Sequence, residues 1–152
     1  MKRKIIVVGI VSIVGMFMLS LSAARPANLG VSNGQLNELP ESPNAVSSQT
    51  EDPSRRIEPI AYSAGQGEVI NLIVSIIEDQ PRTNIVSCTE DYVHAEYTSL
   101  IFRFVDDVEF YLDDNQKLIH FRSASRVGHS DLGTNQRRME DLRNKITAKL
   151  TD

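Results

Sequence analysis

Two residue types that often stabilise small domains, cysteine and tryptophan, are scarce or missing in this sequence. Cys88 is the single cysteine among 152 residues, and there is no tryptophan. One cysteine excludes an intramolecular disulfide, even in an oxidising compartment. No aromatic residue lies between Phe17 and Tyr62, so the middle of the chain is a poor core former. Stability must therefore come from packing in the part that follows.

Positive charge is also in deficit. Lysine and arginine total 16 against 20 aspartates and glutamates, which gives a net charge of -4. Because a nucleic-acid-binding protein usually presents a basic face, nucleic acid is not expected as a partner. The stretch from Gly128 to Gly133 lacks a Gly-Lys-Ser/Thr ending and is therefore not a nucleotide-binding loop. No motif predicts a cofactor.

The N-terminus has the features of a targeting segment. Three basic residues, Lys2 to Lys4, precede an apolar run from Ile5 to Ala24. Residues 1–24 are either a signal peptide cleaved after Ala24 or a retained membrane anchor, since about 20 apolar residues suffice to cross a bilayer. Under the positive-inside rule, the rest of the chain is exported across the cytoplasmic membrane and is periplasmic or anchored with the domain outside.

Beyond this segment the chain divides into a tether and one domain. Residues 25–57 are rich in proline, serine and asparagine and show no helical or strand period, which predicts a tether. Within it, residues 42–49 could still lie ordered against the domain, because Ser and Asn side chains bond local backbone readily. Residues 58–152 remain for a single α+β domain.

The pattern of that domain alternates between helix and strand signals. A helix is expected after Gly65, ending at Gln80-Pro81, and a second from about Thr134 to Leu150. Between them, β-branched and aromatic residues predict three or four strands, at about 84–88, 92–102, 107–112 and 117–125. The short connections favour an antiparallel sheet of about four strands. We expect a two-layer α+β fold, with two helices on one face of the sheet and the N-terminal apolar helix preceding it.

One hairpin can be placed in register from chemistry. A two-residue turn at Asp114-Asn115 would bring apolar residues together on one face and opposite charges together on the other. A slip of one residue would disrupt both faces. The predicted pairs are Phe110 with Ile119, Val108 with Phe121, Glu109 with His120 and Asp107 with Arg122.

Several motifs together resemble the domain of unknown function 1499 family over about residues 39 to 148. They are Ser42-Pro43-Asn44, Pro81-Arg82-Thr83, Asp106-Asp107-Val108-Glu109-Phe110 and the run from Arg122 to Gly133, followed by Asn135, Arg138, Glu140 and Arg143. Leu39 and Ala45 stand where two cysteines are common in the family, so no role of those thiols applies here. The resemblance implies an envelope or membrane-associated setting and carries no established activity.

The best candidate site is the stretch from Arg122 to Arg138, where a strand leads through a loop into a helix start. Helix starts bind anions, yet Arg137 and Arg138 oppose the helix dipole there, so a negative group is expected nearby. It is either a ligand phosphate or carboxylate, or Asp131 and the Asp106/Asp107 pair in an internal network. The candidate anion-site residues are Arg122, Arg126, Arg138, Ser125, Gly128, Gly133 and Asn135.

Other chemistry-bearing residues have weaker patterns. Asp107 and Glu109 share a strand face and are either acid/base residues or ionised cross-strand partners. Two interpretations remain for His94, Glu96, Glu109 and His120: they form a metal site, or they are part of a polar sheet surface. No metal is predicted. Cys88 has no recognisable base beside it, and His129 adds no pattern.

These observations lead to one functional expectation and two alternatives. We expect an exported or membrane-anchored envelope protein that acts as a non-enzymatic binding module for an anionic small molecule, a lipid headgroup or a protein partner. One alternative is a hydrolase-like enzyme using carboxylates and histidines on the sheet face. The other is a scaffold that assembles membrane proteins. No motif bears on the oligomeric state.

Overall fold

The computed structural model describes residues 24–151 of the chain. Apart from Ala24, the predicted signal peptide or membrane anchor lies outside these residues. Within the described range, no helix is both long enough and apolar enough to cross a membrane.

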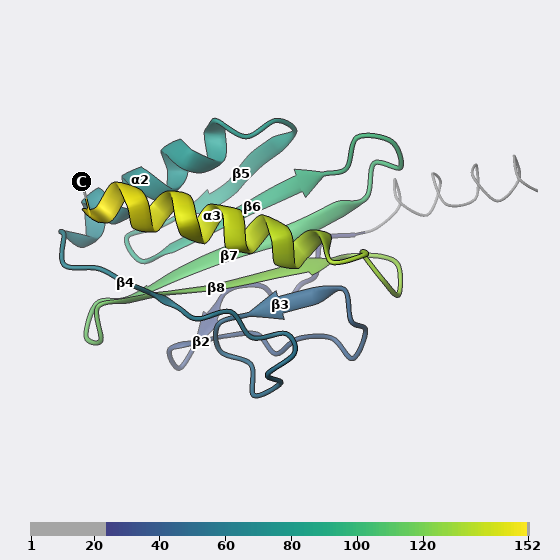
Figure 1. The fold of residues 1–152 in the computed structure, drawn as a ribbon, viewed down its shortest axis with the longest axis horizontal. Coiled ribbons are helices and arrows are strands. Elements are labelled where there is room, and N and C mark those ends of the chain that lie inside the picture. The colour runs from purple at the N-terminus through teal and green to yellow at the C-terminus, as the bar shows by residue number, and fades with distance from the viewer. Residues whose placement is uncertain (1–23, 152) are drawn as a thin grey trace, which may run out of the picture.

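The domain has the α+β composition expected from the sequence (Figure 1). The two helices begin and end within about two residues of their predicted positions, and the four longer strands lie where the apolar and β-branched runs occur. One strand, β6, ends four residues earlier than predicted, which leaves residues 99–104 as a loop. The elements are β1 (Val31–Ser32), β2 (Gln35–Leu36), β3 (Ala45–Ser47), β4 (Ile60–Ala61), α2 (Gln66–Glu78), β5 (Thr83–Cys88), β6 (Tyr92–Thr98), β7 (Val105–Asp113), β8 (Leu118–Ser125) and α3 (Thr134–Thr151).

The main sheet has six antiparallel strands rather than about four. Its order is β3-β8-β7-β6-β5, and β4 also pairs with β8. The additional strands, β3 and β4, are three and two residues long, which is too short for a hydrophobic period to be visible in the sequence. They pair with different parts of β8, residues 122–124 and 118–119 respectively.

The predicted register of the β7–β8 hairpin is wrong by two residues. The turn spans residues 114–117, four residues instead of the two that were predicted. Because the shift is even, every side chain keeps its predicted face, but Arg122 lies opposite Glu109 instead of Asp107. The neighbouring pairs are Phe110–Phe121, Val108–Ser123 and Tyr111–His120.

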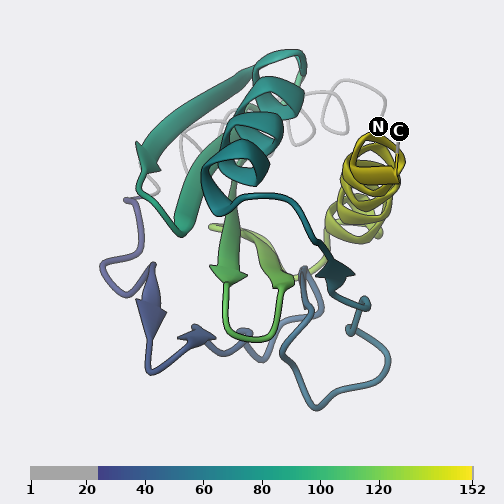
Figure 2. The ribbon, with the colours of Figure 1, turned by 90° about the vertical axis from the view of Figure 1, so that its left-hand side faces the viewer.

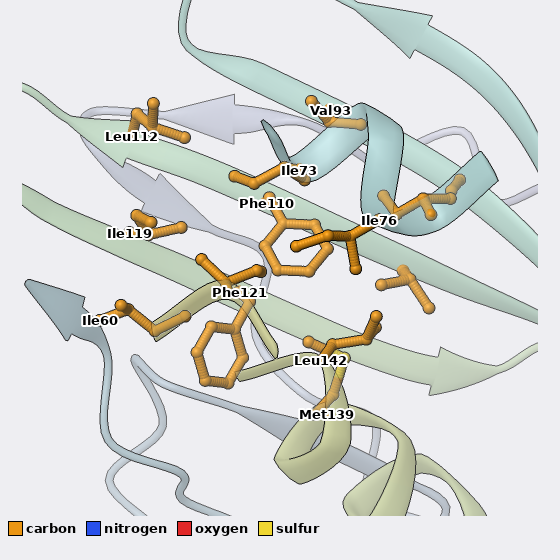
Figure 3. Packing of buried hydrophobic residues seen from close by; sticks show 14 of the residues in the cluster. Ile60, Ile73, Ile76, Val93, Phe110, Leu112, Ile119, Phe121, Met139 and Leu142 are labelled. Atoms are coloured by element: carbon orange, nitrogen blue, oxygen red, sulfur yellow. The ribbon is translucent and has the colours of Figure 1, made fainter. Parts of the chain in front are cut away.

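Both helices pack on the same face of the sheet (Figures 1 and 2). Helix α2 lies against β5 and β6, and α3 lies against β3 and β8. The core between helices and sheet includes Phe110 and Phe121, both fully buried, with ring centroids 6.2 Å apart (Figure 3). Alternation along the strands leaves the other sheet face to polar side chains.

The predicted tether, residues 25–57, differs from a free linker. It contains β1, β2 and β3, and β3 is a strand of the main sheet, so the sheet begins well before residue 58. Its first part, residues 25–40, which we call the N-terminal segment, lies on the side of the sheet away from the helices (Figure 2). Gly30 and Arg25 bond directly to Glu109 and Glu96 on that face. Polar contacts of this kind leave no apolar period in the sequence.

Candidate functional site

Strand alternation divides the predicted anion site between the two faces of the sheet. On β8, Ser123 and Ser125 point toward α3, whereas Arg122 points to the face under the N-terminal segment. Arg138, on α3, lies on the helix side, and Arg126, just after β8, lies with Arg122. The seven predicted residues therefore do not form one site.

On the helix side, the fully buried Asn135 joins three parts of the chain. Its amide nitrogen donates to the carbonyl of Asn44 and to Ser125 Oγ, both at 2.9 Å. Its Oδ1 accepts from Ser123 Oγ and from Arg138 Nη1, the latter at 2.7 Å. All side-chain groups of Asn135 are thus satisfied within the protein, so this residue fastens the chain near β3 to α3.

Arg138 is held by the protein itself. Its Nη2 donates to Asp106 Oδ2 at 2.7 Å, and its guanidinium lies over the Tyr97 ring, 4.8 Å from the centroid. Asp131 accepts from the backbone N–H groups of Asn135 (2.6 Å) and Gly133 (3.0 Å), which places a negative charge at the start of α3. Asp106 thus supplies the negative partner of Arg138, and Asp131 supplies negative charge at the helix start, where Arg137 donates to the carbonyl of Leu132.

The two glycines of the predicted site shape the loop before α3. Gly128 and Gly133 have φ angles of 92° and 75°, a region that glycine reaches without steric cost. The carbonyl of Gly128 accepts from Asn44 Nδ2 at 2.6 Å. Their role is conformational.

On the opposite face, ionised side chains form a continuous chain of contacts. Arg126 Nε and Nη2 donate to the two oxygens of Asp107 at 2.8 and 2.7 Å, and Nη2 also contacts Glu96. Arg25 Nη2 donates to the same Glu96 oxygen at 2.7 Å. On the other side of Asp107, His94 Nε2 donates to Oδ1 at 2.8 Å. Of the predicted internal network, Asp107 belongs to this chain of contacts, which also includes the N-terminal segment, whereas Asp106 and Asp131 lie on the helix side.

These contacts shift the acidity of the groups involved. Burial alone would raise the pKa of Asp107, but hydrogen bonds from Arg126 and His94 outweigh it and lower that pKa. For Glu96, burial is likewise outweighed by Arg126 and Arg25, which lower its pKa. The bond to Asp107, against the cost of burial, raises the pKa of Arg126.

The lowered pKa values predict a loss of stability in acid. A carboxylate whose pKa is lower in the folded state contributes stability above its ordinary pKa, here 3.8 for Asp107 and 4.5 for Glu96. The thermal midpoint is therefore expected to begin falling as the pH drops below about 4.5, because the unfolded chain then binds more protons than the folded domain. Scanning calorimetry across this range measures the effect. Asp107→Asn should start from a lower midpoint and show a shallower fall, and an equally steep fall would contradict the assignment.

Glu109 is fully buried and has three donors around its carboxylate. Its Oε1 accepts from the backbone N–H of Gly30 and from Tyr92 Oη, both at 2.8 Å, and its Oε2 accepts from Arg122 Nη1 at 3.0 Å. Burial and the Glu109 charge raise the pKa of Tyr92, so its hydroxyl stays a donor. No sequence pattern indicated Gly30 or Tyr92 in this role, because neither belongs to a motif.

Only some of the hydrogen-bond donors of Arg122 have partners within the described residues. Its side chain is 9% exposed, and its Nη1 pairs with Glu109. Its Nε is buried and has no hydrogen-bond partner among residues 24–151. Arg122 lines a cavity of about 400 Å³ between the sheet and the N-terminal segment. Residues bordering this space, which we call the Arg122 cavity, include Pro26, Asn28, Leu39, Asp107, Arg122 and Arg126.

The remaining candidates are dispersed or engaged. His94, Glu96 and Glu109 share a face with His120, but among residues 24–151 no three His, Cys, Asp or Glu side chains are grouped as metal ligands. His120 lies 3.3 Å from Ser48 Oγ, and burial lowers its pKa. Cys88 is exposed at the end of β5, and His129 is exposed in the loop after β8.

Comparison with known proteins places these residues in a family context. A family model described as "Protein of unknown function (DUF1499)" matches residues 35–146. That range contains the six-stranded sheet, α2, the part of α3 up to residue 146, and all the paired arginines of the site except Arg25. A search of curated proteins finds no significant match to the chain.

Proposed function

Because this chain belongs to the DUF1499 family, whose description assigns no function, we propose its function from the Arg122 cavity: the domain binds a small molecule that carries a carboxylate or a phosphate. The observation that carries this proposal is that Arg122 lines the cavity while its buried Nε donor has no partner among the described residues. A buried donor without a partner costs about 1–3 kcal/mol, and a bound acceptor removes that cost.

The shape of the guanidinium supports an anion rather than an apolar ligand. Glu109 occupies the Nη1 end of Arg122, which leaves the edge that carries Nε directed elsewhere. That edge presents parallel N–H groups with the spacing of two oxygens of a carboxylate or phosphate. A volume of about 400 Å³ falls within the range of small-molecule sites.

The hydrolase-like alternative is the weaker proposal. A general base needs a lone pair that faces the substrate, and here Asp107 and Glu109 accept bonds from arginine on β8 or just beyond it. Glu109 is also fully buried beneath the N-terminal segment. Binding without chemistry therefore fits the surroundings of these carboxylates better.

We further propose that the domain acts outside the cytoplasmic membrane. The support is in the sequence: three basic residues precede the apolar run from Ile5 to Ala24, which is typical of a signal peptide or an anchor. Protease protection of the full chain in cells, with a cytoplasmic protein as a control, tests this placement. Degradation of the domain by external protease after outer-membrane permeabilisation is the expected result.

If a ligand binds at Arg122, it should stabilise the domain against thermal unfolding. That stabilisation should depend on the two parallel N–H donors of the guanidinium. Titration with inorganic phosphate, glycerol phosphate and succinate, followed by thermal melting, should identify at least one probe that raises the midpoint. A probe at 100 times its Kd adds about 2.7 kcal/mol, or about 10 °C in a domain of this size. Arg122→Lys should weaken that probe by about 10- to 100-fold, because lysine cannot offer two parallel donors.

The lysine variant also separates binding from folding. Its ammonium can still pair with Glu109, so its midpoint without probe should remain close to that of the parent chain. Arg137→Lys, at an exposed position in the first turn of α3, is the matched control and should leave binding unchanged. If no probe stabilises the parent chain, or if Arg122→Lys binds equally well, the proposal is wrong.

A further inference from the structure

Two loops lie side by side at one end of the sheet. Residues 99–104 connect β6 to β7, and residues 126–133 connect β8 to α3. Because the N–H of Arg126 donates to the carbonyl of Val105 at 3.1 Å, the loops leave neighbouring strands at the same end. Figure 1 shows both loops at the right-hand end of the molecule.

These loops carry the most exposed large apolar side chains among the described residues. Leu100 and Ile101 are 69% and 73% exposed, and Leu132 is 85% exposed. The only other large apolar residue counted as exposed in residues 24–151 is Val31, at 37%. Exposed apolar side chains that gather in one place mark an interaction surface.

Exposed arginines surround the same loops. Arg82 donates to the carbonyl of Thr98, where β6 ends, and Arg137 donates to the carbonyl of Leu132. The single acidic residue within the two loops is Asp131, whose carboxylate is already bonded to backbone N–H groups of α3 and its approach. The arginines at this end are Arg25, Arg82, Arg103 and Arg137.

The chain also enters the domain at this end. Arg25 follows directly on the apolar run that ends at Ala24, and it pairs with Glu96 two residues before β6 ends. An apolar segment anchored in a bilayer would therefore hold this end, and not the β7–β8 turn, next to the lipid headgroups. In the sequence, no linker separates the apolar run that ends at Ala24 from Arg25, which already contacts the domain.

We infer that this end of the molecule, formed by residues 99–104 and 126–133 with Arg82 and Arg137, lies on the surface of an anionic bilayer. Leu100, Ile101 and Leu132 insert at the level of the headgroups, as apolar side chains of interfacial proteins do. The arginines face anionic lipid headgroups. The inference rests on the proposed placement of the chain at a membrane and adds which face meets it.

Site-specific fluorescence on the reconstituted full chain tests this orientation. With Cys88→Ser as background, single cysteines at Ile101→Cys or Leu132→Cys carry an environment-sensitive dye. The matched control is Gln116→Cys, exposed in the turn at the opposite end of the sheet. In vesicles of phosphatidylcholine and phosphatidylglycerol, the dyes at 101 and 132 should shift to the blue, brighten several-fold and be quenched by doxyl lipids, while the dye at 116 stays unchanged.

Three other results would each overturn the inference. If the chain does not float with vesicles, both the anchor and the surface contact are overturned. If it floats and all three dyes behave alike, the anchor stands and the orientation is wrong. A blue shift at 101 and 132 that lipid-borne quenchers do not reduce would mean that protein covers these loops, which also overturns the inference. Replacing Arg82, Arg103 and Arg137 with glutamine should reduce the shift in anionic vesicles.

Discussion

Glu109→Gln is expected to destabilise the domain by about 3–5 kcal/mol, because it leaves the buried charge of Arg122 without its partner. Glutamine keeps the size of the side chain and an oxygen that accepts from Gly30 and Tyr92. The loss therefore reports the missing charge. Chemical denaturation measures it, and the thermal midpoint should fall by about 10–20 °C.

A double variant separates the ion pair from the packing around it. Replacing both Glu109 and Arg122 with methionine removes the two charges together, and buried ion pairs replaced by apolar residues of similar size often cost little. The double variant should therefore be more stable than Glu109→Gln. If Glu109→Gln alone costs less than about 1 kcal/mol, water solvates this pair and the assignment of a buried charge is wrong.

Asn135→Leu is expected to cost about 3 kcal/mol. The change leaves the carbonyl of Asn44 and the hydroxyls of Ser123 and Ser125 with fewer partners in a buried place. Since Asn135 fastens the chain near β3, hydrogen exchange should increase most in residues 44–47, beyond the general loss of stability.

The matched control for this change is Gln136→Leu, one residue along α3 and exposed. It should alter stability by no more than about 0.5 kcal/mol, because its side chain bonds only to the exposed Glu140. If the two leucine variants were equally stable, Asn135 would not fasten the segment.

The fold was predictable where one physical signal dominated. Apolar residues three and four apart defined α2 and α3, and β-branched runs defined β5 to β8. The hairpin register failed because Asp114-Asn115 favours a two-residue turn, whereas the chain uses residues 114–117. The charge pairing suggested by the sequence therefore placed Asp107, and not Glu109, opposite Arg122.

The site was less predictable, because composition does not reveal partners. The arginine-rich run singled out Arg122, Arg126 and Arg138, yet two of these are satisfied by Asp107 and Asp106 on opposite faces of one strand. The walls of the Arg122 cavity come partly from a proline- and asparagine-containing segment that has no periodic pattern. If α3 had first been placed on one face of the sheet, strand alternation would have predicted that Arg138 lies on the opposite face from Arg122 and Arg126.

The long sequence separation between the part of the chain around β3 and its partners also constrains the order of folding. Asn44 and Asn135 are 91 residues apart in sequence, and β3 has no strand to pair with until β8 exists. Whether the chain leaves a ribosome or a translocation pore, this segment emerges early and waits for nearly the whole domain to follow. Such distant pairings are slow to form, because chain entropy is lost before they contribute. The Arg122 cavity is therefore expected to close last, so that a ligand meets a binding site only in a chain that has been completed.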